Sequence, residues 1–493
     1  MRDERSAEEV VMRLLKFVAK KSLLALGYPR LETIHPELGI YEVGAVRARV
    51  KETVPACQFF YPVDVIPSKV RRKRRKRVPY FRKEAVDGLL DFLGGFGDGL
   101  MQMLQEKPHP CWYGVDPLLS FEEDEPKAFP LVVFSHGLSG TMEMYTQLCS
   151  QIASTGCVVV AIEHEEGSAS YAERFVSNDN VDDDVVIPYR CAGVDFSKVP
   201  YTRDWETNFR APMLEQRVKE VRNICEFFQE QPRQNTTVVH VEGLEQSSLL
   251  MEQIVSITDP SNLHLVGHSF GGATQLLAAQ TWERERQNES IAKTKASSTS
   301  ESTAGDTVVL QQMEEDAAAT DSFPVPHPLS ITVFDAWNFA MPDSVLSKGL
   351  GNTKPLDSSS MNPKPLEIVS VLSETWATKG PERKYTLEFS NNCDSSNCNV
   401  KAYFCKDSVH QSVSDTEAFV PSFAAQRIGN RGKGEPRHRT IRAMVEEVAQ
   451  FTSSSCSRSR KKDVEAERGT KYNEQEIERT TEEDSALVPI PLQ

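Results

Sequence analysis

Residues 263–274 read LHLVGHSFGGAT, and this stretch decides the fold that we expect. The apolar run LHLVG is followed at once by a glycine-rich turn and then by residues typical of a helix. The pentapeptide GHSFG at 267–271 fits the pattern G-x-S-x-G, in which a serine stands on a strained turn from a strand into a helix. We therefore predict that Ser269 is a nucleophile, because the free N–H groups of the following helix favour negative charge beside it. The alternative is a tight turn without a chemical role.

The segments on either side of this motif predict an α/β protein with a mostly parallel, doubly wound sheet. Residues 130–164 read as a strand, a glycine turn, a helix and a second strand. The runs LVVF and CVVVAI in this segment are continuously apolar, which is typical of strands buried on both faces of a parallel sheet. We expect further strands at 331–334, 366–372 and 400–404, and a helix at 211–230 whose apolar residues recur at helical spacing. Helices should therefore cover both faces of the sheet.

A serine is a weak nucleophile unless a histidine held by a carboxylate takes its proton. Three histidines follow Ser269 in the chain, at positions 327, 410 and 438. His327 precedes the strand ITVF and so lies at the wrong edge of the sheet, while His438 stands in the basic, solvated segment RGKGEPRHRT. His410 follows a predicted strand in KDSVHQS, and we predict that it is the base. His268 adjoins the nucleophile and must point away from it, so we expect it to serve packing.

The residues alone leave two carboxylates eligible to orient His410. Asp335 ends the strand ITVF at the edge where Ser269 ends its own strand, and Glu374 ends the next strand, LEIVSVL. For the oxyanion, hydrolases with this motif use the amide after the nucleophile and a second amide from the loop after an earlier strand. We therefore predict an oxyanion hole formed by the backbone N–H groups of Phe270 and of Leu138, which lies in FSHGLSG.

The composition argues against several other classes of protein. Lys and Arg number 56 against 71 Asp and Glu, a net charge of −15 over 493 residues, so nucleic-acid phosphates would repel the chain. No run approaches the roughly 18 apolar residues of a transmembrane helix. The start MRDERSAEE does not fit a secretory signal, and the 10 cysteines fit reduced thiols, so we expect a cytoplasmic protein. We expect no cofactor and no metal, since Cys393 and Cys398 are spaced widely for a zinc knuckle.

Several segments fall outside the predicted sheet. We place the α/β domain at 35–450, between a helical extension at 1–34 and a disordered tail at 453–493. Residues 288–322 are rich in Ser, Thr, Ala and acids and are predicted to be a disordered insertion. A basic loop at 66–84 contains RRKRRKR at 71–77, which fits a solvated loop, nuclear import or attraction to anionic lipids. An apolar stripe at 86–104 predicts an amphipathic helix for core packing or lipid contact, although five glycines oppose it.

Five motifs in order resemble those of the platelet-activating-factor acetylhydrolases of the plasma and intracellular type II kind. They are FSHGLSG, VVAIEHEEGSAS, GHSFGGAT, FDAW and DSVHQS, and the resemblance covers roughly residues 35–450. It implies an α/β-hydrolase fold and a phospholipase A2 activity that needs no calcium. Carried over motif by motif, it implies Ser269 as nucleophile, Asp335 rather than Glu374 as acid, and His410 as base. It also implies oxyanion amides at Leu138 and Phe270.

The expected function is therefore hydrolysis of a short or oxidised sn-2 acyl ester of a glycerophospholipid. From the start of the sequence we expect no secretory signal like that of the plasma form, and Arg2 stands where the intracellular form has a myristoylated glycine. Peripheral membrane contact would thus rest on the stripe at 86–104 and the basic run at 71–77. The alternatives are a general lipase or carboxylesterase, and a non-catalytic α/β-hydrolase scaffold, against which the intact Ser, Asp and His argue.

Overall fold

A computed structural model gives the conformation of most of the chain. It describes residues 38–51, 53–64, 78–93, 98–119, 128–174, 177–178, 181–182, 185–189, 202–230, 240–241, 247–300, 323–351, 364–419, 436–452 and 486–492, together with Leu14, Phe17, Val18, Lys21 and Ser22. These last five residues are helical. They are the described part of the helical extension that we predicted at 1–34. The basic run at 71–77 lies outside the described residues.

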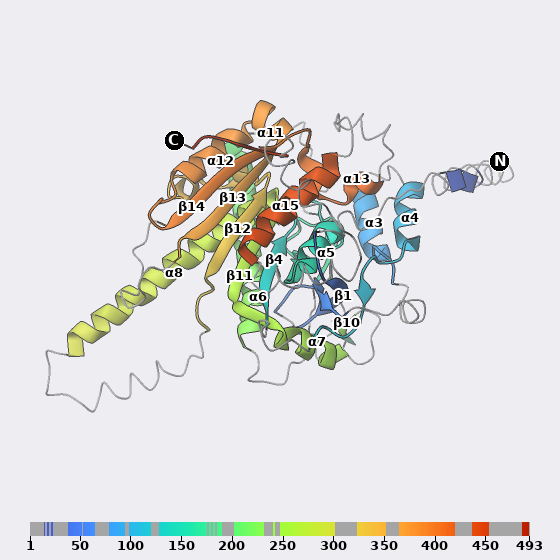
Figure 1. Cartoon of the computed structure of the whole chain (residues 1–493), viewed down its shortest axis with the longest axis horizontal. Helices are drawn as coiled ribbons and strands as arrows, with labels where there is room; N and C mark the ends of the chain where they lie inside the picture. Colours follow the sequence, from blue (N-terminus) through green and yellow to red (C-terminus); the bar gives the residue numbers. More distant parts are fainter. Residues whose placement is uncertain are drawn as a thin grey trace, which may run out of the picture.

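A mixed sheet forms the centre of the molecule, in the order β10-β1-β2-β5-β4-β11-β12-β13-β14-β15, with β3 beside β1 (Figure 1). Neighbouring strands from β5 through β4, β11, β12 and β13 to β14 pair in parallel. The strands flanking this run pair antiparallel, except that β3 pairs in parallel with β1. The mostly parallel α/β sheet predicted from the apolar runs is confirmed. The strands of this sheet are β1 Glu42–Arg49, β2 Cys57–Val63, β3 Trp112–Tyr113, β4 Phe129–Ser135, β5 Val158–Ile162, β10 His240–Val241, β11 Thr258–His268, β12 Pro328–Phe334, β13 Leu366–Ser373, β14 Cys398–Cys405 and β15 Leu487–Pro489.

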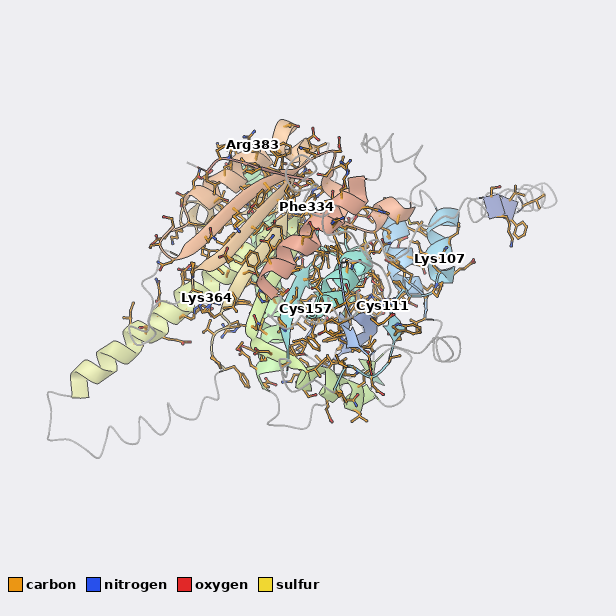
Figure 2. All side chains as sticks on the ribbon, in the orientation of Figure 1. Lys107, Cys111, Cys157, Phe334, Lys364 and Arg383 are labelled. Atoms are coloured by element: carbon orange, nitrogen blue, oxygen red, sulfur yellow. The ribbon has the colours of Figure 1, made fainter. Side chains whose placement is uncertain are left out.

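Helices cover both faces of this sheet. Figure 1 shows α5 (Thr146–Ser154) and α15 (Pro436–Thr452) in front of the strands, and α6 (Arg203–Gln229) and α8 (Phe270–Ser300) behind them. Each pair is in contact, as α5 touches α15 and α6 touches α8. The apolar side chains between the layers form one large core that includes the fully buried Phe334 and Cys157, both labelled in Figure 2. This arrangement, with a serine turn after β11, is the α/β-hydrolase fold.

The remaining described elements are short. The small strands pair outside the main sheet as β6 (Ala172–Arg174) with β9 (Val185–Ile187) and β7 (Ser177–Asn178) with β8 (Val181–Asp182). The other helices are α3 Lys83–Phe92, α4 Asp98–Glu106, α7 Ser247–Ser256, η1 Asn338–Ala340, α10 Asp343–Leu346, α11 Glu374–Lys379, α12 Glu382–Asn391, η2 His410–Val413 and α13 Thr416–Phe419. Within the described parts of the chain, no helix is both long and apolar enough to span a bilayer.

The register of the parallel strands brings their carboxyl ends to one edge of the sheet. Ser135 of β4 pairs with Gly267 of β11, and His268 pairs with Phe334 of β12. Phe334 in turn pairs with Val371 of β13. The loops after these strands therefore start side by side, and they carry the residues singled out from the sequence.

The prediction of a single amphipathic helix at 86–104 is wrong. The chain forms two helices there, α3 and α4, and three of the glycines lie between them, where a helix would lose about 1 kcal/mol per glycine. Much of the stripe belongs to the core, since Val86 and Leu104 are fully buried and Leu89 is 4% exposed. Phe92 and Leu93 remain exposed at the end of α3. Among the described side chains of the stripe, core packing therefore accounts for most of the apolar pattern.

Three other predicted boundaries also change. The insertion predicted to be disordered over 288–322 begins as helix, because α8 continues to Ser300 and projects from the body (Figure 1). The tail predicted to be disordered over 453–493 ends in β15, which extends the sheet beside β14, and Ile490 is buried. The basic loop predicted at 66–84 ends earlier than expected, since Tyr80 and Phe81 are buried and α3 begins at Lys83.

Candidate active site

Ser269 stands on the tight turn between β11 and α8. Its φ is 56°, in the left-handed region that a non-glycine residue rarely adopts, and its N–H donates a 3.0 Å hydrogen bond to the carbonyl of Phe334. Glycine is required beside it, because a Cβ at Gly271 would overlap the carbonyl of Ser135 and one at Gly267 would lie 2.5 Å from the carbonyl oxygen of Gly271. The sequence pattern thus places this hydroxyl on a strained turn at the carboxyl edge of the sheet.

His410 and Asp335 meet Ser269 at that edge. Nε2 of His410 lies 3.0 Å from Oγ of Ser269, and Nδ1 lies 3.0 Å from Oδ2 of Asp335. Asp335 is fully buried, and its Oδ1 accepts a 2.6 Å hydrogen bond from the N–H of Ser373 at the end of β13. The indole ring of Trp376 stacks on the imidazole of His410, with the centroids 4.3 Å apart and the planes at 7°. The Ser269 hydroxyl, the His410 imidazole and the Asp335 carboxylate therefore form a continuous hydrogen-bonded chain. The imidazole ring lies parallel to the indole of Trp376.

The alternative acid and the two alternative bases do not contact Ser269 or His410 in the described hydrogen bonds. Oε2 of Glu374 accepts a 2.6 Å hydrogen bond from the N–H of Asp407, in the turn before His410. His327 lies next to Pro328, at the start of β12 and so at the opposite end of that strand from Asp335. His438 is in α15.

The two predicted oxyanion amides lie on segments that pack together. Leu138 is in the turn after β4, and Phe270 is the first residue of α8, whose opening N–H groups have no partner within the helix. A Cβ added to Gly137 would lie 3.0 Å from Cβ of Ser269, so the turn after β4 runs beside the nucleophile. Ser139, directly after Leu138, has a φ of 56°, which marks a sharp reversal of the loop. This geometry brings both segments to the hydroxyl.

His268 has a larger role in the site than the packing that we expected. Its Nε2 lies 2.8 Å from the carbonyl of His410, so this nitrogen carries the proton and donates. Its Nδ1 therefore accepts from the hydroxyl of Tyr145 at 2.7 Å, and that hydroxyl accepts from the N–H of Gly137 at 3.3 Å. Burial and the nearby His410 hold the pKa of His268 well below its usual value, which keeps it neutral. A hydrogen-bonded chain thus joins the turn after β4 to the backbone of the base.

Sequence reasoning missed Tyr145 and Trp376. Tyr145 precedes α5, and Trp376 is on α11, so both reach the site only through packing. Neither residue belongs to a motif with a known spacing from the serine. The place of His268 in the pentapeptide GHSFG was the one sequence signal that it belongs to the site. That place does not reveal its hydrogen-bond partners, Tyr145 and the carbonyl of His410.

One group of potential metal ligands occurs among the residues that the structure describes. His164, Glu166 and Glu220 are buried, and their ligand atoms lie within 4.8 Å of one another. Two of their atoms already have partners, because Nδ1 of His164 lies 2.6 Å from Glu220 and Oε1 of Glu166 accepts from Arg217 at 2.7 Å. Cys393 and Cys398 are not part of such a group in the described chain. Cys393 instead accepts from the N–H of Leu350.

Comparison with known proteins identifies the family to which this site belongs. The family described as "Platelet-activating factor acetylhydrolase, isoform II" matches residues 30–474. The chain belongs to this family. The resemblance carried by the five sequence motifs is thereby confirmed, and the match reaches beyond the roughly 35–450 that those motifs suggested.

Individual acetylhydrolases are similar over a shorter stretch. The platelet-activating factor acetylhydrolase of Canis lupus familiaris is 29% identical over 164 residues, 32% of this chain and 33% of that protein. The enzyme of the same name from Gallus gallus is 27% identical over 201 residues, 39% of this chain and 44% of its own. A putative phospholipase A2 of Schizosaccharomyces pombe is 52% identical over 40 residues, 8% of this chain and 9% of that protein. The chain therefore matches less than half the length of each of these relatives.

A solved structure with a similar chain path is a ferulic acid esterase from Streptomyces cinnamoneus. The comparison covers 91% of this chain and 96% of that one, with 13% sequence identity and a TM-score of 0.46.

Proposed function

We propose that this member of the acetylhydrolase family is a serine esterase that hydrolyses the short or oxidised sn-2 acyl ester of glycerophospholipids. Its activity would be that of a calcium-independent phospholipase A2, or 1-alkyl-2-acetylglycerophosphocholine esterase. The observation that supports it most strongly is the chain of two 3.0 Å contacts from Ser269 through His410 to Asp335. Family membership supports the lipid ester as the substrate class.

The proposed reaction starts with the hydroxyl of Ser269. Nε2 of His410 takes the hydroxyl proton while Oγ bonds to the ester carbonyl carbon, and the carbonyl electron pair moves to oxygen. Asp335 accepts from Nδ1 of His410, which orients the ring and stabilises the imidazolium that forms. The backbone N–H groups of Leu138 and Phe270 would bind the oxyanion.

The two halves of the reaction are separated by an acyl-enzyme. Collapse of the tetrahedral intermediate breaks the ester bond, and His410 gives its proton to the departing glycerol oxygen. A water then attacks the acyl group with His410 as base, and the carboxylic acid leaves as Ser269 regains its proton. No cofactor takes part in this sequence of steps.

Two measurements test the proposal. Covalent labelling of Ser269 by a fluorophosphonate, followed by mass spectrometry of the labelled peptide, separates an esterase from a non-catalytic scaffold. We expect stoichiometric labelling of the wild type, and an unlabelled, folded protein would overturn the proposal. Hydrolysis of phosphatidylcholines of graded sn-2 length, compared with triacylglycerols, then separates a short-chain phospholipid esterase from a general lipase. We expect the rate to fall as the sn-2 chain lengthens and to be lower on the triacylglycerol.

A further inference from the structure

A buried arginine holds the loop that carries Leu138. Arg217, on α6, is 0% exposed, and its Nη1 donates a 2.6 Å hydrogen bond to the carbonyl of His136, directly after β4. Its Nε lies 3.0 Å from Oγ of Ser168, and the carbonyl of Ser168 accepts a 2.7 Å hydrogen bond from the N–H of Ser139. The guanidinium thus fixes His136 directly and Ser139 through Ser168. Leu138 lies between these two anchored residues.

The same guanidinium reaches the second predicted amide. Cζ of Arg217 lies 4.7 Å from the centroid of the Phe270 ring, and Phe270 is the first residue of α8. A guanidinium over an aromatic face is attracted by the negative face of the ring, more strongly where water is excluded. One side chain therefore contacts both segments that supply the predicted oxyanion amides. This side chain comes from a third segment, α6, which carries none of the three residues of the Ser269 hydrogen-bonded chain.

The charge around Arg217 is nearly balanced. Its Nε also donates to Oε1 of Glu166 at 2.7 Å, in an ion pair whose side chains are 0% and 3% exposed. Burial and the charge of Arg217 lower the pKa of His136 to about 3 and that of His164 well below its usual value. Burial is the main cause that raises the pKa of Glu220 well above its usual value, and repulsion from Glu166 is the second. Arg217 and Glu166 therefore form a buried ion pair whose interaction water screens only weakly.

We propose that Arg217 is the positioning residue of the oxyanion hole, holding the amides of Leu138 and Phe270 at a fixed separation. The inference rests on the proposed ester hydrolysis. When Oγ of Ser269 bonds to the ester carbon, the carbonyl oxygen gains a negative charge that the free enzyme lacks. Donors that are already oriented toward that oxygen stabilise the transition state without reorganising. Arg217 should therefore act on kcat more than on KM.

The test removes both members of the ion pair, because losing Arg217 alone would leave the Glu166 carboxylate buried and unpaired. In Arg217→Met with Glu166→Gln, we expect kcat per labelled active site to fall about 10²-fold on p-nitrophenyl acetate, with KM changed little. Inhibition by a trifluoromethyl ketone, which forms a tetrahedral adduct with the serine, should weaken by a similar factor. A purely structural role would lower the fraction of sites that a fluorophosphonate labels and would leave kcat per site and inhibitor affinity unchanged.

Arg49→Met with Glu165→Gln is the matched control. It removes another buried ion pair, with a 2.8 Å contact, that touches neither oxyanion segment in the described hydrogen bonds. We expect this control to keep wild-type kcat per site. If thermal unfolding shows that the first double variant does not fold, Arg217→Lys serves in its place, since it keeps the charge but not the forked donors. A tenfold lower kcat per site supports the proposal, and a folded variant with kcat and inhibitor affinity within twofold of wild type overturns it. An inactive wild type would instead refute the proposed function.

Discussion

Oδ2 of Asp335 lies 3.0 Å from Nδ1 of His410 and is fully buried beside it. Glu374, at the end of the neighbouring strand, turns its carboxylate to the N–H of Asp407 instead. Asp335 directly follows β12 with a φ of 45°, whereas Glu374 begins α11. Glu374 thus stabilises the turn before His410 without contacting the imidazole in the described hydrogen bonds.

The choice between the two carboxylates is directly testable. We expect Asp335→Asn to lower kcat by about 10⁴, because an amide in place of the carboxylate leaves the histidine in the wrong tautomer. Glu374→Gln keeps an oxygen that can accept from Asp407, so most of the activity should remain. Hydrolysis of a soluble short-chain ester by both variants, beside their thermal unfolding, makes the comparison. A severe loss in Glu374→Gln with full activity in Asp335→Asn would move the acid to Glu374.

The nucleophile has its own test. Ser269→Ala should lower ester hydrolysis by about 10⁴ or more, as expected when a triad nucleophile is removed. The melting temperature should hardly change, since the variant loses only one hydroxyl, at a turn residue that is 6% exposed. Ser256→Ala, which removes an exposed hydroxyl at the end of α7, is the control and should retain full activity. Retention of most activity in Ser269→Ala would contradict the assignment.

Metal removal should leave the activity unchanged. The three hydrogen-bonded residues and the two amides supply nucleophile, base and charge stabilisation without a Lewis acid. In the one ligand-like group of the described chain, at His164, Glu166 and Glu220, Nδ1 of His164 already contacts Glu220 and Oε1 of Glu166 accepts from Arg217. Rates measured before and after dialysis against EDTA check this expectation. A large loss that calcium or zinc restores would point to a metal-assisted phospholipase.

We propose that the end of α3 contacts the lipid surface. Phe92 is 43% exposed and Leu93 is 36% exposed there. The neighbouring α4 contacts α13, which lies against the η2 segment of His410, so this end of the molecule flanks the site (Figure 1). Phe92→Ser with Leu93→Ser should weaken binding to anionic vesicles about tenfold, because burying only the exposed part of these two side chains contributes about 1.4 kcal/mol in total.

The controls for membrane contact separate binding from folding. Hydrolysis of a soluble ester and the melting temperature of the double variant should stay near wild type. Leu329→Ser removes a side chain that is also 43% exposed but lies at the start of β12, away from the site, and should not change co-sedimentation with vesicles. Unchanged vesicle binding by the double variant would exclude this contact, and a destabilised, inactive protein would assign both residues to the core.

A buried histidine away from the site predicts part of the pH dependence of stability. His264, on β11, bonds to Ser330 and Asn262, and burial lowers its pKa to about 4. The unfolded chain binds this proton below about pH 6.5 and the folded chain does not, so the contribution to stability is full above pH 6.5 and is lost as pH falls toward 4. Between pH 7.5 and 5.5, the free energy of unfolding should fall by about 1 kcal/mol more in the wild type than in His264→Gln. Urea titrations at both pH values measure the difference, and equal falls would show that His264 titrates normally.

The sequence by itself determined the parts of the protein that depend on neighbours along the chain. Continuous apolar runs identified the buried parallel strands, and G-x-S-x-G after one of them located the turn at Ser269, because strand burial and a tight turn both depend on local residue types. The order of residues after the serine also limited the base to three histidines. The same reasoning failed at 86–104 and at the tail, where glycines split a helix and a short edge strand had too weak a pattern to predict.

Only the tertiary structure decided which distant residues meet. The sequence pattern left Asp335 and Glu374 equivalent, and the motif resemblance favoured Asp335, but contact with His410 depends on how each strand ends at the sheet edge. Tyr145, Trp376 and Arg217 reach the site from three separate segments, and each contact joins residues far apart in the chain. Such contacts arise when layers pack around a sheet, so no periodicity or spacing within one segment encodes them.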